Sequence, residues 1–204
     1  VRQHLKGETQ MKYHLIFSIF LFILISLTSC KKENSPTEPQ GSSNFIPLPL
    51  KHQNFWTFNH IDSSGVTEYT NTITSTTVIN NETIYVFNDD WLFDKDGFYY
   101  SDGVLYGLKV SNPSNSKEVV FPKNPSVGQM WTVKGFTLQL EAINVSVTVP
   151  AGTFNCYKIL DIPPSGSSST QYYLYWSNGI GPIKAEDKNN VNIKDELKGY
   201  KVTN

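Results

Sequence analysis

The sequence predicts an all-β fold, an antiparallel meander curled into a half-barrel, a barrel or a sandwich, preceded by a signal helix and a disordered tether. From Phe45 onward, apolar and polar residues alternate with a period of two, which is typical of half-buried strands. Turn-forming residues recur at short and fairly even intervals, which leaves room for about ten to twelve short strands. Such a series of hairpins favours a meander that closes partly or fully on itself.

The clearest strand covers residues 143–149. Ile143, Val145, Val147 and Val149 fall on one face, and Asn, Ser and Thr residues fall on the other. Residues 150–153 interrupt this pattern with Pro, Ala and Gly, so 143–162 is expected to form an antiparallel hairpin. Other strands are expected at residues 72–79, 83–87, 98–100, 105–110, 137–140 and 172–176.

Asp94-Lys95-Asp96-Gly97 resembles the start of a calcium loop, but the rest of that loop is missing. Leu92 and Gly103 stand at its first and twelfth positions, where carboxylate oxygens are required. We therefore predict a hairpin turn between Leu92-Phe93 and Phe98-Tyr99. Further turns are predicted at residues 62–65, 80–82, 101–103 and 163–169, and the one helical candidate is 188–197.

The N-terminal region carries a secretory signal. From Met11 it has a basic residue, Lys12, an apolar run over residues 15–27, and Leu27-Thr28-Ser29 before Cys30. The apolar run is too short to span a bilayer comfortably. We predict that residues 11–29 are the signal peptide and that residues 1–10 are a mis-assigned upstream start.

The end of this segment resembles a bacterial lipoprotein signal. The resemblance implies cleavage before Cys30, acylation of its thiol by groups such as palmitate, and anchoring in a membrane. Residues 30–44 would then be the acylated Cys and its tether, and 45–204 a single β-domain. The rival reading, a buried helix ending in a chance Cys, fits poorly with Lys31-Lys32. Lys31 stands where enteric lipoproteins of the inner membrane have Asp, so the cell envelope, and the outer membrane within it, is the favoured location.

Composition excludes several classes of function. Removing Arg2, Lys6, Lys12 and Glu8 with the signal leaves 14 basic and 17 acidic residues, a net charge of −3, and no Arg. Nucleic acid is therefore not an expected partner, because its recognition depends on clustered Lys and Arg.

Cysteine and histidine are too few for the usual catalytic and metal sites. Apart from Cys30 the chain has one Cys, Cys156, so no intramolecular disulfide is expected. A buried Cys156 is favoured over a catalytic nucleophile. With His52 and His60 it makes no zinc ligand set. No metal, cofactor or catalytic residue is predicted, and the protein is not expected to be an enzyme.

Aromatic residues are the remaining candidates for a binding site. Tyr and Trp suit concave, partly wet sites for sugars, lipids or peptides. In residues 172–176 aromatic side chains occupy both faces of one strand, so one face is free to line a cavity. Ordinary packing in a β core is the alternative. The candidate ligand-binding residues are Trp91, Tyr100, Tyr173, Tyr175 and Trp176.

Two segments resemble a group of uncharacterised envelope lipoproteins of Bacteroidota-like bacteria. These are the VPAGTF turn at residues 149–154 and the YLYWSNGIGPIK element at residues 173–184. An early Pro-x-x-x-Gly-x-x-Trp pattern of that group has Gln53 in place of Gly before Trp56, whereas Gly128 is kept before Trp131. The resemblance implies a curved antiparallel sheet akin to lipoprotein-carrier half-barrels, and it implies no catalytic residues.

These observations predict a non-enzymatic, lipid-anchored protein of the bacterial cell envelope. Its curved sheet is expected to bind a hydrophobic or glycan ligand, or an envelope protein. One alternative is a hydrolase of envelope glycans or lipids that uses carboxylates brought together by the fold. The other is a structural spacer.

Overall fold

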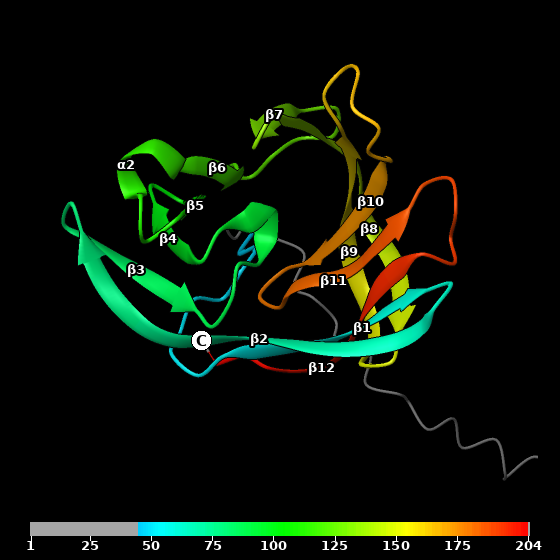
Figure 1. Cartoon of the computed structure of the whole chain (residues 1–204), viewed down its shortest axis with the longest axis horizontal. Helices are drawn as coiled ribbons and strands as arrows, with labels where there is room; N and C mark the ends of the chain where they lie inside the picture. The colour runs from blue at the N-terminus through cyan, green and yellow to red at the C-terminus, as the bar shows by residue number, and fades with distance from the viewer. Residues whose placement is uncertain (1–44, 204) are drawn as a thin grey trace, which may run out of the picture. The chain divides into compact units, whose positions relative to one another are not determined.

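An antiparallel sheet of twelve strands forms the part of the chain that the structure, a computed structural model, describes, residues 45–203 (Figure 1). The fold class is as predicted. Ser43–Asn204 belong to one compact unit. The predicted signal peptide, Cys30 and the tether lie outside the described residues. Among those residues, no helix has the length and apolar character needed to cross a membrane.

The strands follow one another in meander order, and their neighbours in the sheet run β6-β5-β4-β3-β2-β1-β12-β11-β10-β9-β8-β7. Residues 45–203 also form two short helical turns, η1 (Leu92–Asp94) and α2 (Pro113–Ser116). The strands are β1 (Phe55–Asp62), β2 (Gly65–Ile79), β3 (Glu82–Phe87), β4 (Gly97–Ser101), β5 (Val104–Leu108), β6 (Glu118–Phe121), β7 (Met130–Val133), β8 (Phe136–Val149), β9 (Gly152–Ile162), β10 (Tyr172–Ser177), β11 (Gly181–Asp187) and β12 (Lys194–Lys201).

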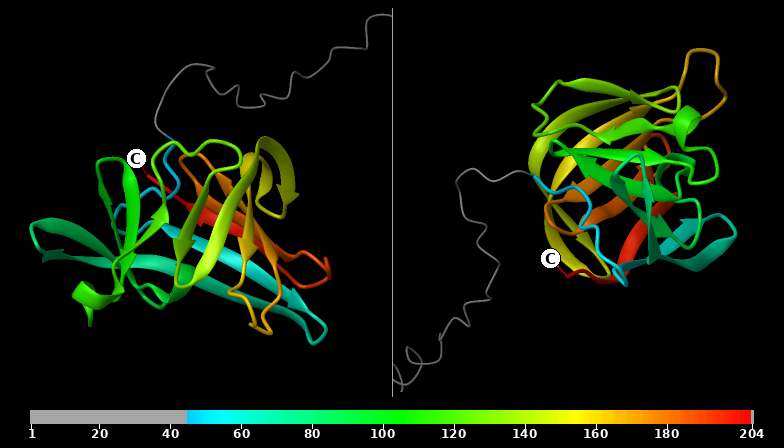
Figure 2. Two further views of the ribbon diagram at one scale, coloured as in Figure 1. Left: turned by 90° about the horizontal axis from the view of Figure 1, so that it is seen from above. Right: turned by 90° about the vertical axis from the view of Figure 1, so that its left-hand side faces the viewer.

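The two edge strands, β6 and β7, come together through side chains, so the sheet is nearly closed into a barrel (Figures 1 and 2). The indole Nε1–H of Trp131 donates to the carbonyl oxygen of Val120 at 3.1 Å. The backbone N–H of Lys134 donates to Glu118 Oε1 at 2.8 Å. No backbone ladder joins β6 to β7 in the described sheet. These two side-chain bonds therefore connect β6 and β7 at the seam, where a fully closed barrel would have backbone hydrogen bonds between the two strands.

A bulge in β8 corrects one sequence prediction. Val147 and Val149 are buried as predicted, but Ile143 is 45% exposed. The register of β8 against β9 shifts between Leu140 and Val145, and Asn144 adopts a φ of 58° there. Such a shift exchanges the two faces of a strand. Leu140 and Val147 therefore share the buried face although an odd number of positions separates them.

One end of the barrel is closed by the segment that enters the domain, residues 45–50. Leu48 is fully buried, and the hydroxyl of Tyr100 bonds both its N–H and its carbonyl oxygen at 3.0 Å. Gly181 lies beside this segment with a φ of 114°, and a Cβ there would stand 3.1 Å from Trp56 Nε1 and 3.3 Å from Leu48 Cδ1. Gly181 therefore lets β11 pass close to Trp56 and Leu48.

Two other sequence predictions are wrong. The helical candidate at 188–197 is a turn followed by β12, whose residues pair with both β1 and β11. Asp94–Gly97 is no hairpin turn, because Leu92-Phe93 lies in η1 rather than in a strand. Residues 88–96 form the connection between β3 and β4, and this connection builds one side of the candidate site.

Candidate functional site

A cavity of about 220 Å³ lies on the concave side of the sheet, between that face and the β3–β4 connection, the roof loop (residues 88–96). Its sheet side comes from β1, β2, β9, β10, β11 and β12. It is smaller than typical ligand pockets, about 300–1,000 Å³, but larger than the roughly 150 Å³ that holds a benzene ring. The lining residues are Phe58, Tyr69, Trp91, Leu92, Phe93, Asp161, Leu174, Trp176, Pro182, Lys184, Ala185 and Asp195.

Five of the twelve lining residues of the cavity are aromatic. Phe58 and Tyr69 face each other across β1 and β2 with ring centroids 5.5 Å apart and nearly parallel planes. The ring of Trp91 lies 6.3 Å from Phe58 and 5.1 Å from the buried Trp56. Trp176 is 2% exposed and lies on β10. Flat walls of this kind suit a ring, an alkyl chain or an organic cation.

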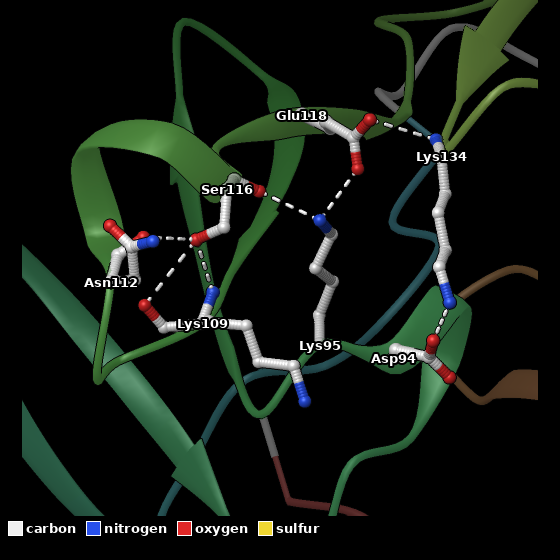
Figure 3. Close-up of polar contacts among 7 residues, drawn as sticks. All are labelled: Asp94, Lys95, Lys109, Asn112, Ser116, Glu118 and Lys134. Carbon is white, nitrogen blue, oxygen red and sulfur yellow. Dashed lines mark hydrogen bonds and ion pairs between the residues drawn. The ribbon is translucent and has the colours of Figure 1, made fainter.

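Three ion pairs hold the roof loop to the β5–β7 region. Lys95 is buried, and its Nζ lies 2.6 Å from Glu118 Oε2 and donates to the carbonyl oxygen of Ser116 at 2.8 Å. Asp94 pairs with Lys134 Nζ, and Asp90 pairs with Lys109 Nζ. Figure 3 shows two of these pairs: Lys95 of the roof loop meets Glu118 on β6, and Asp94 meets Lys134 in the turn after β7.

These contacts hold a loop whose backbone is strained. Phe93 and Asp94 both adopt left-handed conformations, with φ values of 56° and 55°. Such a conformation costs about 1 kcal/mol or more for a residue other than Gly. Phe93 thereby contributes to the cavity wall while Asp94 reaches Lys134.

Asp161 brings a carboxylate with one unpaired oxygen into the cavity wall. It lies near the end of β9, and its Oδ1 is buried without a hydrogen-bond partner among the described residues. Burial raises the pKa of this carboxyl group to about 6. Near neutral pH the charged form therefore dominates, but it is poorly compensated.

The other carboxylate of the cavity, Asp195, is well supplied with donors. His60 Nδ1 lies 2.9 Å from Asp195 Oδ1. Burial, followed by the charge of Asp195 and a hydrogen bond to it, raises the pKa of the Tyr69 hydroxyl, which stays neutral. Asp195 thus differs from Asp161 in having partners.

Lys184 is the one cation among the described lining residues, and its ammonium is engaged on the opposite face of the sheet. It pairs with Glu186, and its Nζ lies 5.9 Å from the ring centroid of Tyr175. Lys184 and Tyr175 are also direct cross-strand partners. Asp161 is therefore left without a counter-charge inside the cavity.

The structure brings two of the five predicted aromatic residues, Trp91 and Trp176, together in the cavity. Tyr100 is placed elsewhere. Its hydroxyl bonds the backbone of Leu48 at the closed end, and burial raises its pKa.

Tyr173 and Tyr175 point to the outer face of the sheet, where cations cover them. Lys158 Nζ lies 3.5 Å from the ring centroid of Tyr173 and pairs with Glu141 at 3.0 Å. The hydroxyl of Tyr175 donates to Glu186 Oε1 at 2.7 Å. The charged and polar groups around Tyr173 and Tyr175 therefore satisfy one another.

Sequence reasoning missed Asp161 and the roof loop. Alternation along β9 places Asp161 on the same face as Ile159, which is 1% exposed. A carboxylate on the buried face of a strand could therefore have identified Asp161 as a candidate site residue. Its approach to Trp91 depends on pairing between distant strands, which the sequence pattern does not contain.

No group of three or more His, Cys, Asp or Glu side chains in residues 45–203 is arranged to hold a metal ion. Cys156 is fully buried, as predicted, and burial raises the pKa of its thiol to about 12. A thiol in that state is a poor nucleophile.

Two solved structures resemble this chain, while no known family and no curated protein matches its sequence. One is a candidate exported protein with a YmcC-like fold from Bacteroides fragilis, with a TM-score of 0.44 and 15% identity, covering 77% of this chain and 99% of that chain. The other is a candidate lipoprotein from Parabacteroides distasonis, with a TM-score of 0.41 and 15% identity, covering 78% and 100%. The resemblance to Bacteroidota-type lipoproteins through the VPAGTF turn stays a prediction.

Proposed function

We propose that this protein is a lipid-anchored, non-enzymatic protein of the bacterial envelope whose β domain binds a small group in the cavity under the roof loop. The observation that carries the binding role is a cavity of about 220 Å³ with aromatic walls and a carboxylate oxygen that has no partner in the described part of the chain. The cavity is large enough for one ring or one extended side chain, so its occupant is a small molecule or a single side chain of a partner.

Chain connectivity supports this role. The segment that follows the predicted tether enters at the closed end of the barrel, where Ile46 and Leu48 are bonded. Asp161 and Asp195 lie toward the other end, near the turns at 163–171 and 188–193. An anchor at Cys30 would thus join the domain at the end away from these carboxylates and leave the cavity accessible from the envelope space.

Filling the cavity tests the binding role. Ala185 lines the cavity and is small, so Ala185→Leu should occupy the space without removing a polar group. Residues 31–204, secreted into the periplasm of an expression host, contain the whole compact unit. A native mass spectrum should show a bound mass on the wild-type chain and none on the variant. A bound mass on both would place the ligand elsewhere, and none on either would remove this support for the proposal.

A second candidate function is hydrolysis of an envelope glycan. Two carboxylates line one cavity, and the pKa of Asp161 is raised to about 6, as a general acid requires. The small volume of the cavity and the donors already bound to Asp195 favour binding over catalysis. Chromogenic glycosides test the alternative: turnover lost in both Asp161→Asn and Asp195→Asn would establish an enzyme.

A further inference from the structure

We propose that the cavity selects an organic cation, an alkylammonium group whose charge pairs with Asp161 while its carbon chain lies between the rings of Trp91 and Trp176. This inference rests on the proposed binding function and names the chemical class of its ligand.

Charge balance in the cavity favours a cation over a neutral or anionic group. Asp161 and Asp195 are the two carboxylates of the wall, and the ammonium of the one lining cation, Lys184, pairs with Glu186 on the outer face of the sheet. Asp195 already has His60 Nδ1 at 2.9 Å. Asp161 Oδ1 has no such partner within the described residues. A positively charged donor would supply both the missing hydrogen bond and the missing counter-charge.

The aromatic rings of the cavity wall also favour a cation. The faces of Trp, Tyr and Phe attract cations, and Trp does so most strongly. Trp91, Trp176 and Phe58 lie around the same space as Asp161. A hydroxyl group could bond the carboxylate, but it would gain nothing from the ring faces and would leave the charge uncompensated.

The volume limits the chain length. The cavity of about 220 Å³ is larger than a cavity of roughly 150 Å³ that holds benzene. The extra volume has room for only a few more carbon atoms. Butylammonium is therefore a suitable probe, 1-butanol is its neutral counterpart, and butyrate is its anionic counterpart.

The experiment is a titration of residues 31–204 at pH 8, followed by the four indole N–H signals of the uniformly ¹⁵N-labelled chain. Butylammonium should shift the signals of Trp91 and Trp176 and bind about tenfold or more tightly than 1-butanol, as a charge-assisted hydrogen bond allows. Asp161→Asn should remove this preference. Asp102→Asn, the same change at an exposed turn, should retain it.

Acidification is an independent arm that needs no variant. Protonation of Asp161 should weaken butylammonium binding between pH 8 and pH 5 and leave 1-butanol unaffected. The other titratable groups of the lining are Tyr69, Asp195, which His60 Nδ1 approaches at 2.9 Å, and Lys184, whose ammonium pairs with Glu186 on the outer face. Asp187 lies two residues beyond Ala185 on β11, and its Oδ1 accepts from the N–H groups of Asn189 and Asn190. His60→Gln should therefore leave the pH effect in place.

Two further ligands tell the sources of the group apart, because a peptide side chain and a lipid headgroup can carry the same ammonium. Tighter binding of Nα-acetyllysine amide points to a peptide, and tighter binding of phosphoethanolamine points to a lipid.

Equal affinity for butylammonium and 1-butanol, with both blocked by Ala185→Leu, would overturn the cation inference and leave the proposed function intact. No shift of Trp91 or Trp176 with any of these ligands would count against both.

Discussion

At the scale of single residues, the domain holds its polar groups in two different states. Most are satisfied within the chain, as with Lys95, Tyr100 and Asp195. Asp161 is an exception, because burial disfavours its charged form and no described residue bonds its Oδ1. The buried Nδ2 of Asn71 also has no partner among the described residues, but it carries no charge. A native structure keeps such a group at a cost to stability, and groups of this kind concentrate at functional sites.

Because burial of the charged Asp161 lowers stability, the variant Asp161→Asn should have a higher free energy of unfolding, by an amount that depends on pH. A folded-state pKa of about 6, against an ordinary value of 3.8 for an Asp side chain, means that the fold favours the protonated carboxyl. The wild type is then most stable below the unfolded pKa and loses stability as the pH rises through the folded pKa. Two pKa units correspond to about 3 kcal/mol, and partial exposure to water reduces the expected gain at pH 7.5 to about 1 kcal/mol.

Urea denaturation at pH 4 and pH 7.5 measures this difference. The Asp161→Asn chain should equal the wild type at pH 4 and exceed it at pH 7.5. Asp102→Asn should show no such trend. A gain of the same size at both pH values would mean that the charge of Asp161 is not the cause.

Cys156 predicts an unreactive thiol. Burial raises its pKa to about 12, so almost no thiolate exists at pH 8. Iodoacetamide should leave native residues 31–204 unlabelled and should modify them fully in urea. Rapid labelling of the folded chain would show that the strand around Cys156 opens readily.

At the scale of elements, the roof loop is the part whose position most depends on ion pairs. Three of its charged residues, Asp90, Asp94 and Lys95, form ion pairs in the β5–β7 region, and a fourth, Asp96, accepts from the N–H of Val110 at 2.8 Å. The Lys95–Glu118 pair is the most protected, with side-chain exposures of 7% and 32%. Removing one partner of a protected pair costs more than removing one partner of an exposed pair, because the other charge is left partly buried and unpaired.

Lys95→Met should therefore lower the free energy of unfolding by about 2 kcal/mol, because it leaves Glu118 without its ammonium partner. Lys198→Met is a matched control in the Lys198–Glu68 pair, whose side chains are each 50% exposed. The control should change stability by less than about 0.5 kcal/mol. Equal effects in the two variants, measured by urea denaturation, would contradict the role given to the roof loop pair.

The strand pattern of the sheet was predictable because it depends on local alternation and turn residues. Residues 72–79 and 172–176 became strands as expected, and Asn80 and Asn81 form a turn with φ values of 53° and 65°. The bulge at Asn144 and the path of residues 88–96 were not, because both follow from packing between strands far apart in the sequence. Trp91 and Trp176 were candidates because of their residue type alone. Their position beside Asp161 depends on packing between distant strands and was not predicted.

At the scale of the whole molecule, the sheet is nearly closed into a barrel (Figure 2). A small cavity lies under the roof loop. The seam between β6 and β7 depends on side chains rather than on a ladder. Trp131→Phe should keep the ring near Phe121, whose centroid is 5.7 Å away, and remove the bond to Val120. We expect a loss of about 1 kcal/mol and faster amide exchange confined to β6 and β7; exchange that rises evenly through the sheet would contradict a local seam.

The predicted anchor makes a separate prediction for the full chain. Several acyl chains on Cys30, at about 0.8 kcal/mol per buried methylene, should hold the protein in the membrane fraction. Cys30→Ser should move it to the soluble envelope fraction and abolish incorporation of labelled palmitate. Membrane retention of the variant would mean that another part of the chain provides the attachment.

The most direct measurement is a crystal structure of residues 31–204 soaked with butylammonium. We predict a molecule under the roof loop with its nitrogen about 3 Å from Asp161 Oδ1 and its carbon chain between Trp91 and Trp176. A cavity that stays empty, or a ligand bound only outside it, would contradict the assignment of this cavity as the binding site.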